Sequence, residues 1–139
     1  MSVHMTGQSV GATGMRLRHG PSGAELVTAA PVDNGGDGSS FSPTDLCAVS
    51  LGACASTIVR LYAARAGISL AGVRFEVDKE MSAAPPRRIA RLTVTYWFDT
   101  TCDATDFTKL ERAARTCPVR LTLGPDVEVV EQFQRETAA

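Results

Sequence analysis

The sequence predicts a mixed α and β domain, because it contains one long apolar helix and several segments in which apolar and polar residues alternate. The helical segment, residues 43–66, carries no charge over its middle, and alternating segments precede and follow it. The chain has 139 residues, of which 44% are hydrophobic and 21% charged, as in an ordinary globular protein. We therefore expect a single α+β domain over residues 1–139.

The N-terminal region predicts a flexible arm followed by a hairpin. Its start lacks the positive charge and apolar run of a secretory signal, which predicts a cytoplasmic protein whose residues 1–12 form the arm. Residues 15–18 and 25–29 alternate weakly around a turn at residues 19–23, which indicates two paired strands. The loop that follows, residues 34–40, is rich in glycine but lacks the GK[ST] ending of a phosphate-binding loop.

The clearest helix start in the chain lies at Ser42. Ser42 is the predicted N-cap, Pro43 takes the first helical position, and the Asp45 carboxylate can reach back to the cap amide. With Gly67 as its stop, the helix covers residues 43–66 and is about 36 Å long. A helix without charge on any face over its middle must be surrounded by protein, so we expect a second copy of the chain to cover it in a homodimer.

Two further strands and a second helix are predicted after the long helix. Residues 73–78 alternate, a turn follows at residues 82–86, and residues 90–98 place their apolar side chains on one face, so the pair forms an antiparallel hairpin. Residues 104–116 show helical spacing, and Cys117 closes the apolar stripe of that helix.

The chain ends in an amphipathic closing strand. Val127, Val129 and Glu131 share one face, and Glu128, Val130 and Gln132 share the other. The alternation therefore predicts an amphipathic strand.

Charge and composition exclude several classes of partner and cofactor. A net charge of −1 at pH 7 leaves no basic surface for nucleic acid or an anionic membrane. The uncharged run at residues 46–59 is shorter than the roughly 20 residues of a membrane span. The cysteines include no CxxC pair, and both histidines, His4 and His19, lie near the N-terminus, which argues against a metal site. We expect no cofactor.

Four cysteines in a reducing compartment are more consistent with free or catalytic thiols than with structural disulfides. Cys47 and Cys54 are seven residues apart on one helix face, about 10 Å along the axis, which is too far for a bridge. Cys47 is interpreted as a small buried hydrophobic residue, and Cys102 as a thiol of a polar loop. Cys54 and Cys117 both lie on inward faces and form a thiol pair if the fold brings them together.

Several blocks of sequence resemble the OsmC/Ohr family (osmotically inducible protein C and organic hydroperoxide resistance protein). They are FSPTDL at residues 41–46, SLGAC at residues 50–54, and CPV at residues 117–119 followed by LGP at residues 123–125. The resemblance implies an α+β fold in which antiparallel sheets wrap around long central helices in an intertwined homodimer.

The same resemblance implies the activity. It predicts a thiol-dependent peroxidase that reduces organic (alkyl or lipid) hydroperoxides, in which Cys54 attacks the peroxide and Cys117 resolves the product. No metal, flavin or haem is needed, and an external dithiol of the lipoyl or thioredoxin type reduces the enzyme. The predicted helix C-terminus at Cys117 points to the same roles, because carbonyl groups there disfavour a thiolate.

Activation of Cys54 requires a cation, since Cys54 lies far from the N-terminus of its helix. The resemblance implies an arginine from the N-terminal region, which is Arg16 or Arg18 in this chain. Members active on peroxides carry a glutamate where this chain has Thr44; Asp45 supplies a carboxylate one residue later, about 100° further around the helix.

Apolar side chains predicted around Cys54, from Leu51, Ile58 and Phe107, favour an alkyl or lipid hydroperoxide over hydrogen peroxide. Two other functions compete with this one. A cysteine hydrolase is disfavoured, because neither histidine falls where a Cys-His pair needs it. A non-catalytic dimer that binds an apolar small molecule in the pocket between the helices remains an alternative.

Overall fold

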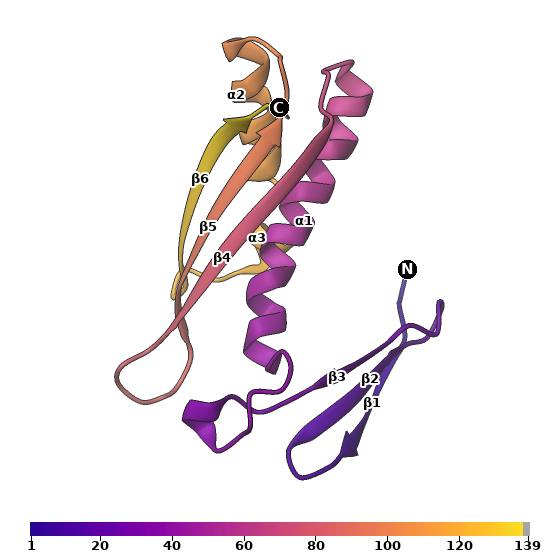
Figure 1. Ribbon diagram of the computed structural model, residues 1–139, viewed down its shortest axis with the longest axis vertical. Coiled ribbons are helices and arrows are strands. Elements are labelled where there is room, and N and C mark those ends of the chain that lie inside the picture. Colours follow the sequence, from indigo (N-terminus) through magenta and orange to yellow (C-terminus); the bar gives the residue numbers. More distant parts are fainter. Residues whose placement is uncertain (138–139) are drawn as a thin grey trace. The chain divides into compact units, whose positions relative to one another are not determined.

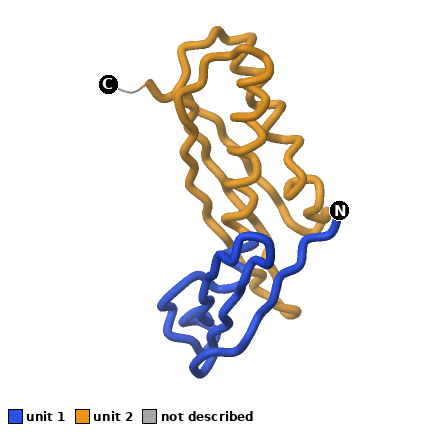
Figure 2. Tube along the Cα trace, turned by 90° about the vertical axis from the view of Figure 1, so that its right-hand side faces the viewer, with its two compact units in different colours: residues 1–47 blue, residues 48–139 orange. Residues whose placement is uncertain are grey.

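The computed structural model describes residues 1–137 and contains two compact units, and the boundary between them along the chain falls within the long helix (Figures 1 and 2). The first unit comprises residues 1–47 and the second begins at residue 48. Each unit contains a three-stranded sheet. The α+β class is therefore confirmed, whereas the assignment of the whole chain to a single domain stays a prediction.

The first unit is an antiparallel sheet in the order β1-β2-β3, with β1 at Met5–Val10, β2 at Gly14–His19 and β3 at Glu25–Thr28. The hairpin expected from the sequence is β2–β3. The flexible arm expected at residues 1–12 is wrong for residues 5–10, which pair along the full length of β2. Strand β1 forms because its pairing satisfies the backbone hydrogen-bonding groups at the edge of β2. Such pairing does not require alternating apolar residues in β1, so the sequence pattern did not reveal it. A short 3-10 turn, η1 (Val32–Asn34), follows the sheet.

The long helix α1 spans Pro43–Ala66, as predicted. Its capping box is formed: the Ser42 amide donates to Asp45 Oδ2 at 2.8 Å, and the Asp45 amide donates to Ser42 Oγ at 3.1 Å. The helix ends at Gly67, whose φ of 69° suits a residue without a side chain.

The second sheet has the order β4-β5-β6, with β4 at Gly72–Met81, β5 at Ile89–Asp99 and β6 at Glu128–Glu136. The β4–β5 hairpin is antiparallel as expected, but β6 runs parallel to β5, so the expectation of wholly antiparallel sheets is wrong. The segment that connects β5 to β6 explains why the two strands are parallel. Two helices, α2 (Ala104–Ala114) and α3 (Pro118–Thr122), carry the chain back to the start of β5 before β6 begins.

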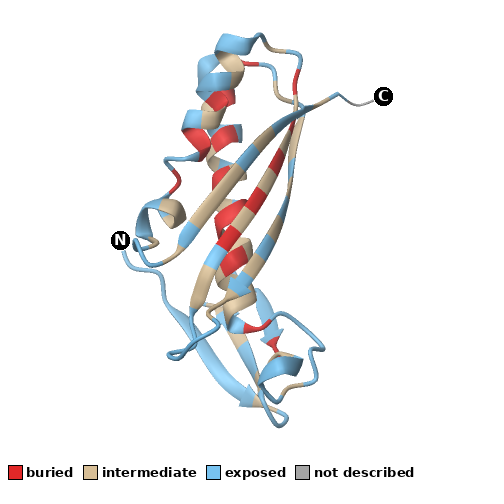
Figure 3. Ribbon diagram, turned by 90° about the vertical axis from the view of Figure 1, so that its left-hand side faces the viewer, coloured by how far each residue is buried: buried red, intermediate tan, exposed pale blue. Residues whose placement is uncertain are grey.

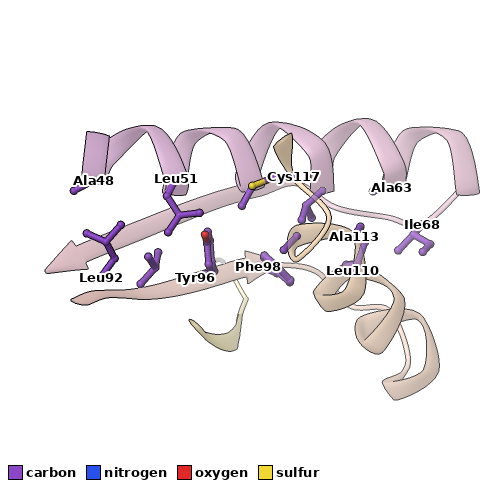
Figure 4. Close-up of a cluster of buried hydrophobic side chains, with 14 residues drawn as sticks. Ala48, Leu51, Ala63, Ile68, Leu92, Tyr96, Phe98, Leu110, Ala113 and Cys117 are labelled. Atoms are coloured by element: carbon purple, nitrogen blue, oxygen red, sulfur yellow. The ribbon is translucent and has the colours of Figure 1, made fainter. Parts of the chain in front are cut away.

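The core of the second unit lies between one face of α1, the inward face of β5, and α2 (Figures 3 and 4). The β5 side chains that alternate into it are the predicted ones and are fully buried: Leu92, Val94, Tyr96 and Phe98. On α1 the buried positions recur every three or four residues: Ala48, Leu51, Ala55, Val59 and Ala63.

The opposite side of α1 is exposed at Ala53, Thr57 and Leu61. Among residues 1–137, α1 is the one helix that is long and apolar enough to cross a membrane, but the core helix of a globular protein meets the same criteria. Its buried face packs into the core described above, so α1 is interpreted as a core helix.

Candidate functional site

The site is built around two cysteines that come from different elements of the second unit. Cys54 lies near the middle of α1, half-buried against the core. Cys117 lies between α2 and α3 and is fully buried. Figure 4 shows the Cys117 sulfur beside α1. Cys54 lies close enough to Cys117 to raise the pKa of the Cys117 thiol, so the fold unites the pair that the sequence singled out.

The local structure of Cys117 differs from the expectation. α2 ends at Ala114, and Cys117 has an extended backbone and caps the N-terminus of α3, where its sulfur accepts a hydrogen bond from the Arg120 amide at 3.3 Å. The argument that carbonyls of a helix C-terminus disfavour a Cys117 thiolate is therefore wrong. Pro118 is the reason, because it cannot continue α2 but suits the first position of a new helix.

Cys117 nevertheless resists ionisation. Burial raises the pKa of the Cys117 thiol, while the hydrogen bond from the Arg120 amide lowers it. The nearby Cys54 and the Glu131 carboxylate raise it further. The net shift is upward, so burial now supports the weaker nucleophilicity that the sequence analysis ascribed to a helix dipole.

A buried carboxylate lies beside the thiols. The Glu131 side chain, on β6, is only 5% exposed, and its Oε1 accepts from Arg120 Nε at 3.1 Å. Tyr96 of β5 is fully buried close to the same carboxylate, and burial followed by the charge of Glu131 raises the pKa of its hydroxyl. The hydroxyl also lies near Cys117 and Cys54.

The sequence analysis did not assign Tyr96, Arg120 or Glu131 to the site. A signal for Glu131 was present, because a carboxylate shares the apolar face of the closing strand with Val127 and Val129. In the structure Glu131 pairs in register with Val94 of β5, whose side chain is buried. An acidic residue in phase with a buried face marks a candidate site, because an unpaired buried charge is costly.

The two predicted activating arginines lie in the first unit, on β2. Arg16 and Arg18 are both exposed and two residues apart, hence on one face of the sheet. They line a shallow hollow together with Glu25, which lies 3.8 Å from Arg18. The activation of Cys54 by either arginine stays a prediction.

The remaining polar candidates have local structural roles. Asp45 belongs to the capping box of α1, and the Thr44 hydroxyl lies 3.1 Å from Ser42 Oγ. Cys47 is half-buried on the first turns of α1. The Cys102 amide donates to Thr100 Oγ1 at 3.1 Å in the loop before α2.

The three predicted pocket residues occupy different surroundings. Leu51 is fully buried in the core, and Phe107 packs on Phe98 with ring centres 5.4 Å apart. Ile58 lines a hollow of about 490 Å³ between α1 and α2. A substrate pocket formed by all three stays a prediction. Over residues 1–137, no group of three or more His, Cys, Asp and Glu side chains is arranged to hold a metal ion.

Comparisons with known proteins give a family match. A family model described as OsmC-like protein matches residues 36–131. Among solved structures, one from Psychrobacter arcticus 273-4, named as an osmotic stress induced and detoxification response protein, is 35% identical over 93% of both chains, with a TM-score of 0.86.

Two more distant structures share the fold. An organic hydroperoxide resistance protein OsmC from Legionella pneumophila is 20% identical over 96% of this chain and 97% of its own, with a TM-score of 0.78. An organic hydroperoxide resistance protein from Elizabethkingia anophelis is 14% identical over 98% of this chain and 97% of its own, with a TM-score of 0.79. No curated protein matches the chain.

Proposed function

The chain belongs to the OsmC-like protein family, and from this premise we propose that it is a thiol-dependent peroxidase that reduces organic hydroperoxides through Cys54 and Cys117. One observation carries the proposal: two free thiols from separate elements lie close together, so that Cys54, which is half-buried, raises the pKa of the fully buried Cys117. The names of the Legionella and Elizabethkingia structures, both organic hydroperoxide resistance proteins, support the same reaction.

The chemistry divides between the two thiols. The Cys54 thiolate attacks the outer oxygen of the hydroperoxide, the O–O bond breaks, and an alcohol leaves after protonation, so that sulfur is oxidised to a sulfenic acid. Cys117 then attacks the Cys54 sulfur, and the sulfenic oxygen leaves as water while a disulfide forms. The order follows from burial, because the raised pKa of Cys117 disfavours it as the first nucleophile.

The proposal includes partners that complete the cycle. An external dithiol of the lipoyl or thioredoxin type reduces the disulfide, which places the cycle in the cytoplasm, where such reductants keep thiols reduced. A second copy of the chain covers the exposed side of α1 at Ala53, Thr57 and Leu61. One of Arg16 and Arg18 promotes ionisation of Cys54.

A second candidate function is a non-catalytic dimer that binds an apolar small molecule. The hollow of about 490 Å³ between α1 and α2, which includes Ile58, Leu61 and Tyr62, favours it. In that case the cysteines have no chemical role, and a Cys54→Ser variant binds the ligand as the wild-type protein does.

Peptide mapping after one equivalent of tert-butyl hydroperoxide tests the peroxidase. We expect a Cys54–Cys117 disulfide in the wild-type protein, with Cys47 and Cys102 still reduced. Cys117→Ser should retain a sulfenic acid on Cys54 that a carbon nucleophile traps, and Cys54→Ser should consume no peroxide. Cys47→Ser and Cys102→Ser are matched controls that should turn over normally. Turnover by Cys54→Ser, or a bridge between other cysteines, contradicts the mechanism.

A further inference from the structure

Glu131 is a buried charge that the two-thiol mechanism does not use. One of its oxygens is paired with the Arg120 guanidinium at 3.1 Å, which offsets the negative charge inside the protein. The other, Oε2, is buried and makes no hydrogen bond of standard geometry to any described residue. A buried acceptor without a donor is costly, so its retention calls for a functional explanation.

A second unpartnered polar atom lies at the same place. The Tyr96 hydroxyl is buried and likewise makes no hydrogen bond of standard geometry among residues 1–137. It is nevertheless near enough to Glu131, Cys117 and Cys54 that all three raise the pKa of the phenol. Figure 4 shows its oxygen directed from β5 toward α1, the helix beside which the Cys117 sulfur lies. The Tyr96 hydroxyl and the Glu131 carboxylate interact with each other beside the thiol pair, and they place one donor and one acceptor close to the reacting sulfurs.

The resolving step needs such groups. Cys117 must lose a proton before its sulfur attacks, and the sulfenic oxygen must gain one before it leaves as water. Both proton movements occur in a buried site, where burial holds Cys117 in its protonated form. Solvent is a poor carrier there, and a fixed carboxylate beside the thiol is a better one.

We propose that the Glu131 carboxylate carries the proton of the resolving step from Cys117 to the departing sulfenic oxygen, and that the Tyr96 hydroxyl donates a hydrogen bond to that same oxygen. This inference rests on the proposed peroxidase function. Arg120 is a positioning residue that holds the carboxylate through Oε1 and leaves Oε2 available.

The step is balanced in atoms and electrons. The proton of the Cys117 thiol moves to Glu131 as the Cys117 sulfur attacks the Cys54 sulfur and the S–O bond breaks. The departing hydroxide takes that proton and leaves as water, and Glu131 returns to its carboxylate form. The two sulfurs end as a disulfide, and the oxidising equivalent is the one that the hydroperoxide delivered to Cys54.

Ionisable groups near Glu131 include Arg120 of α3, Tyr96 of β5 and Cys117 of the α2–α3 junction. Cys54 of α1 lies near Tyr96 and Cys117. Arg120 is the one cation among them, and its amide also donates to the Cys117 sulfur at 3.3 Å. Replacing the side chain of Glu131 therefore leaves that amide contact in place.

Stopped-flow mixing of the reduced protein with tert-butyl hydroperoxide separates the two steps. Trapping of the sulfenic acid reports the first step, and loss of free thiol at Cys117 reports the second. In Glu131→Gln the first step should keep at least a third of its wild-type rate, and disulfide formation should slow by roughly 100-fold. Glu128→Gln, the same substitution on the exposed face of β6, is the matched control and should resolve at the wild-type rate.

The pH profile distinguishes proton transfer from a structural role. In Glu131→Gln the rate of disulfide formation should rise about tenfold per pH unit up to the pKa of Cys117, because that thiol must then ionise to solvent. The wild-type profile should be much flatter near neutral pH. Glu131→Asp, which keeps the carboxylate, should recover a large part of the rate and the flat profile.

Tyr96→Phe tests the hydrogen bond and covers the case in which Glu131→Gln does not fold. It removes a hydroxyl that makes no hydrogen bond of standard geometry among residues 1–137, so the unfolding midpoint should stay close to the wild-type value. Disulfide formation should still slow by about tenfold, the effect of one lost hydrogen bond. A wild-type resolving rate in this variant overturns the role of Tyr96.

The two proposals fail in different ways. If wild-type protein forms no sulfenic acid on Cys54, the peroxidase function is wrong and this inference falls with it. If Cys54 oxidises normally and Glu131→Gln resolves at the wild-type rate with the wild-type pH profile, the inference alone is overturned. A first step slowed in Glu131→Gln as much as the second also overturns it, because the carboxylate then acts on the pair as a whole.

Discussion

The two compact units differ in how much of their apolar surface they bury. The second unit has a core of fourteen buried residues that joins α1, β5 and α2. In the first unit the buried residues are Thr28, Ala29 and Ser42. Several large apolar side chains of its sheet are exposed: Met5, Met15, Leu26 and Val27.

The second unit is therefore expected to be rigid, whereas the first unit is expected to need a partner that covers its exposed apolar side chains. Three short strands whose large apolar side chains are exposed bury little apolar surface by themselves. The thiol pair, Glu131 and Tyr96 all belong to the unit with the packed core, where side-chain positions are fixed by their neighbours. The residues proposed to activate Cys54 belong to the other unit. A reaction that needs both units is therefore expected to depend on assembly, whereas the proton chemistry of the thiol pair is not.

The largest effect on stability is expected at Gly52, where the packing of the second unit leaves no space for a larger side chain. A Cβ added at Gly52, on the buried face of α1, would overlap the Phe75 ring. Gly52→Ala gains some helix propensity but forces Phe75 out of place, for a net loss of about 2 kcal/mol in the free energy of unfolding. Urea unfolding measures it.

Gly72→Ala is the matched control, because nothing lies within 4 Å of the added Cβ. Its free energy of unfolding should stay within about 0.5 kcal/mol of the wild type. A loss of less than about 0.5 kcal/mol in Gly52→Ala as well would contradict the prediction, because the Phe75 ring would then make room for the added Cβ at little cost.

The first unit and the outer side of α1 predict a homodimer. Light scattering should give twice the chain mass of 14.7 kDa. Unfolding should depend on concentration, with a loss of about 1.4 kcal/mol for each tenfold dilution. Leu61→Glu, at the exposed position on α1, should dissociate the dimer, whereas Leu121→Glu on α3 should not, although both leucines are exposed. A stable monomer of the wild-type chain rules out this prediction.

Elements with a strong local pattern were predictable from the sequence. The capping residues Ser42 and Asp45, with Gly67, set the bounds of α1 correctly, and strict alternation gave the buried face of β5. Strand β1 was missed, because its polar residues show no apolar alternation and its existence depends on pairing with β2.

Features that depend on tertiary structure were not predictable in the same way. The parallel direction of β6 depends on how α2 and α3 return the chain, which no local pattern encodes. The sequence placed Cys117 on the inward stripe but at the wrong helix end, because Pro118 both stops α2 and starts α3. The Arg120–Glu131 pair joins α3 to β6, and only the fold reveals that it lies beside the thiols.

Neutralising the arginines of β2 tests whether the oxidation of Cys54, in the second unit, depends on the first unit. Either Arg16→Ala or Arg18→Ala should slow the oxidation of Cys54 by about tenfold, which corresponds to about 1.4 kcal/mol of lost interaction with the thiolate. The other variant serves as its matched control, since both side chains are exposed on the same sheet. Stopped-flow trapping of the sulfenic acid measures the rate. Wild-type rates in both variants would place the activating cation outside the first unit.

The smallest effect concerns the pH dependence of stability in the second unit. The pKa of Cys117 is raised in the folded protein, chiefly by burial, so the unfolded chain loses this thiol proton at a lower pH than the folded chain. The contribution of Cys117 to stability is then fully present below about pH 8.5, the pKa of an unperturbed cysteine, and is lost as pH rises toward the raised value. Urea unfolding of the reduced protein should show this alkaline decline in the wild type and in Cys102→Ser, but a shallower one in Cys117→Ser. Identical slopes in all three proteins would mean that the burial of Cys117 does not shift its ionisation.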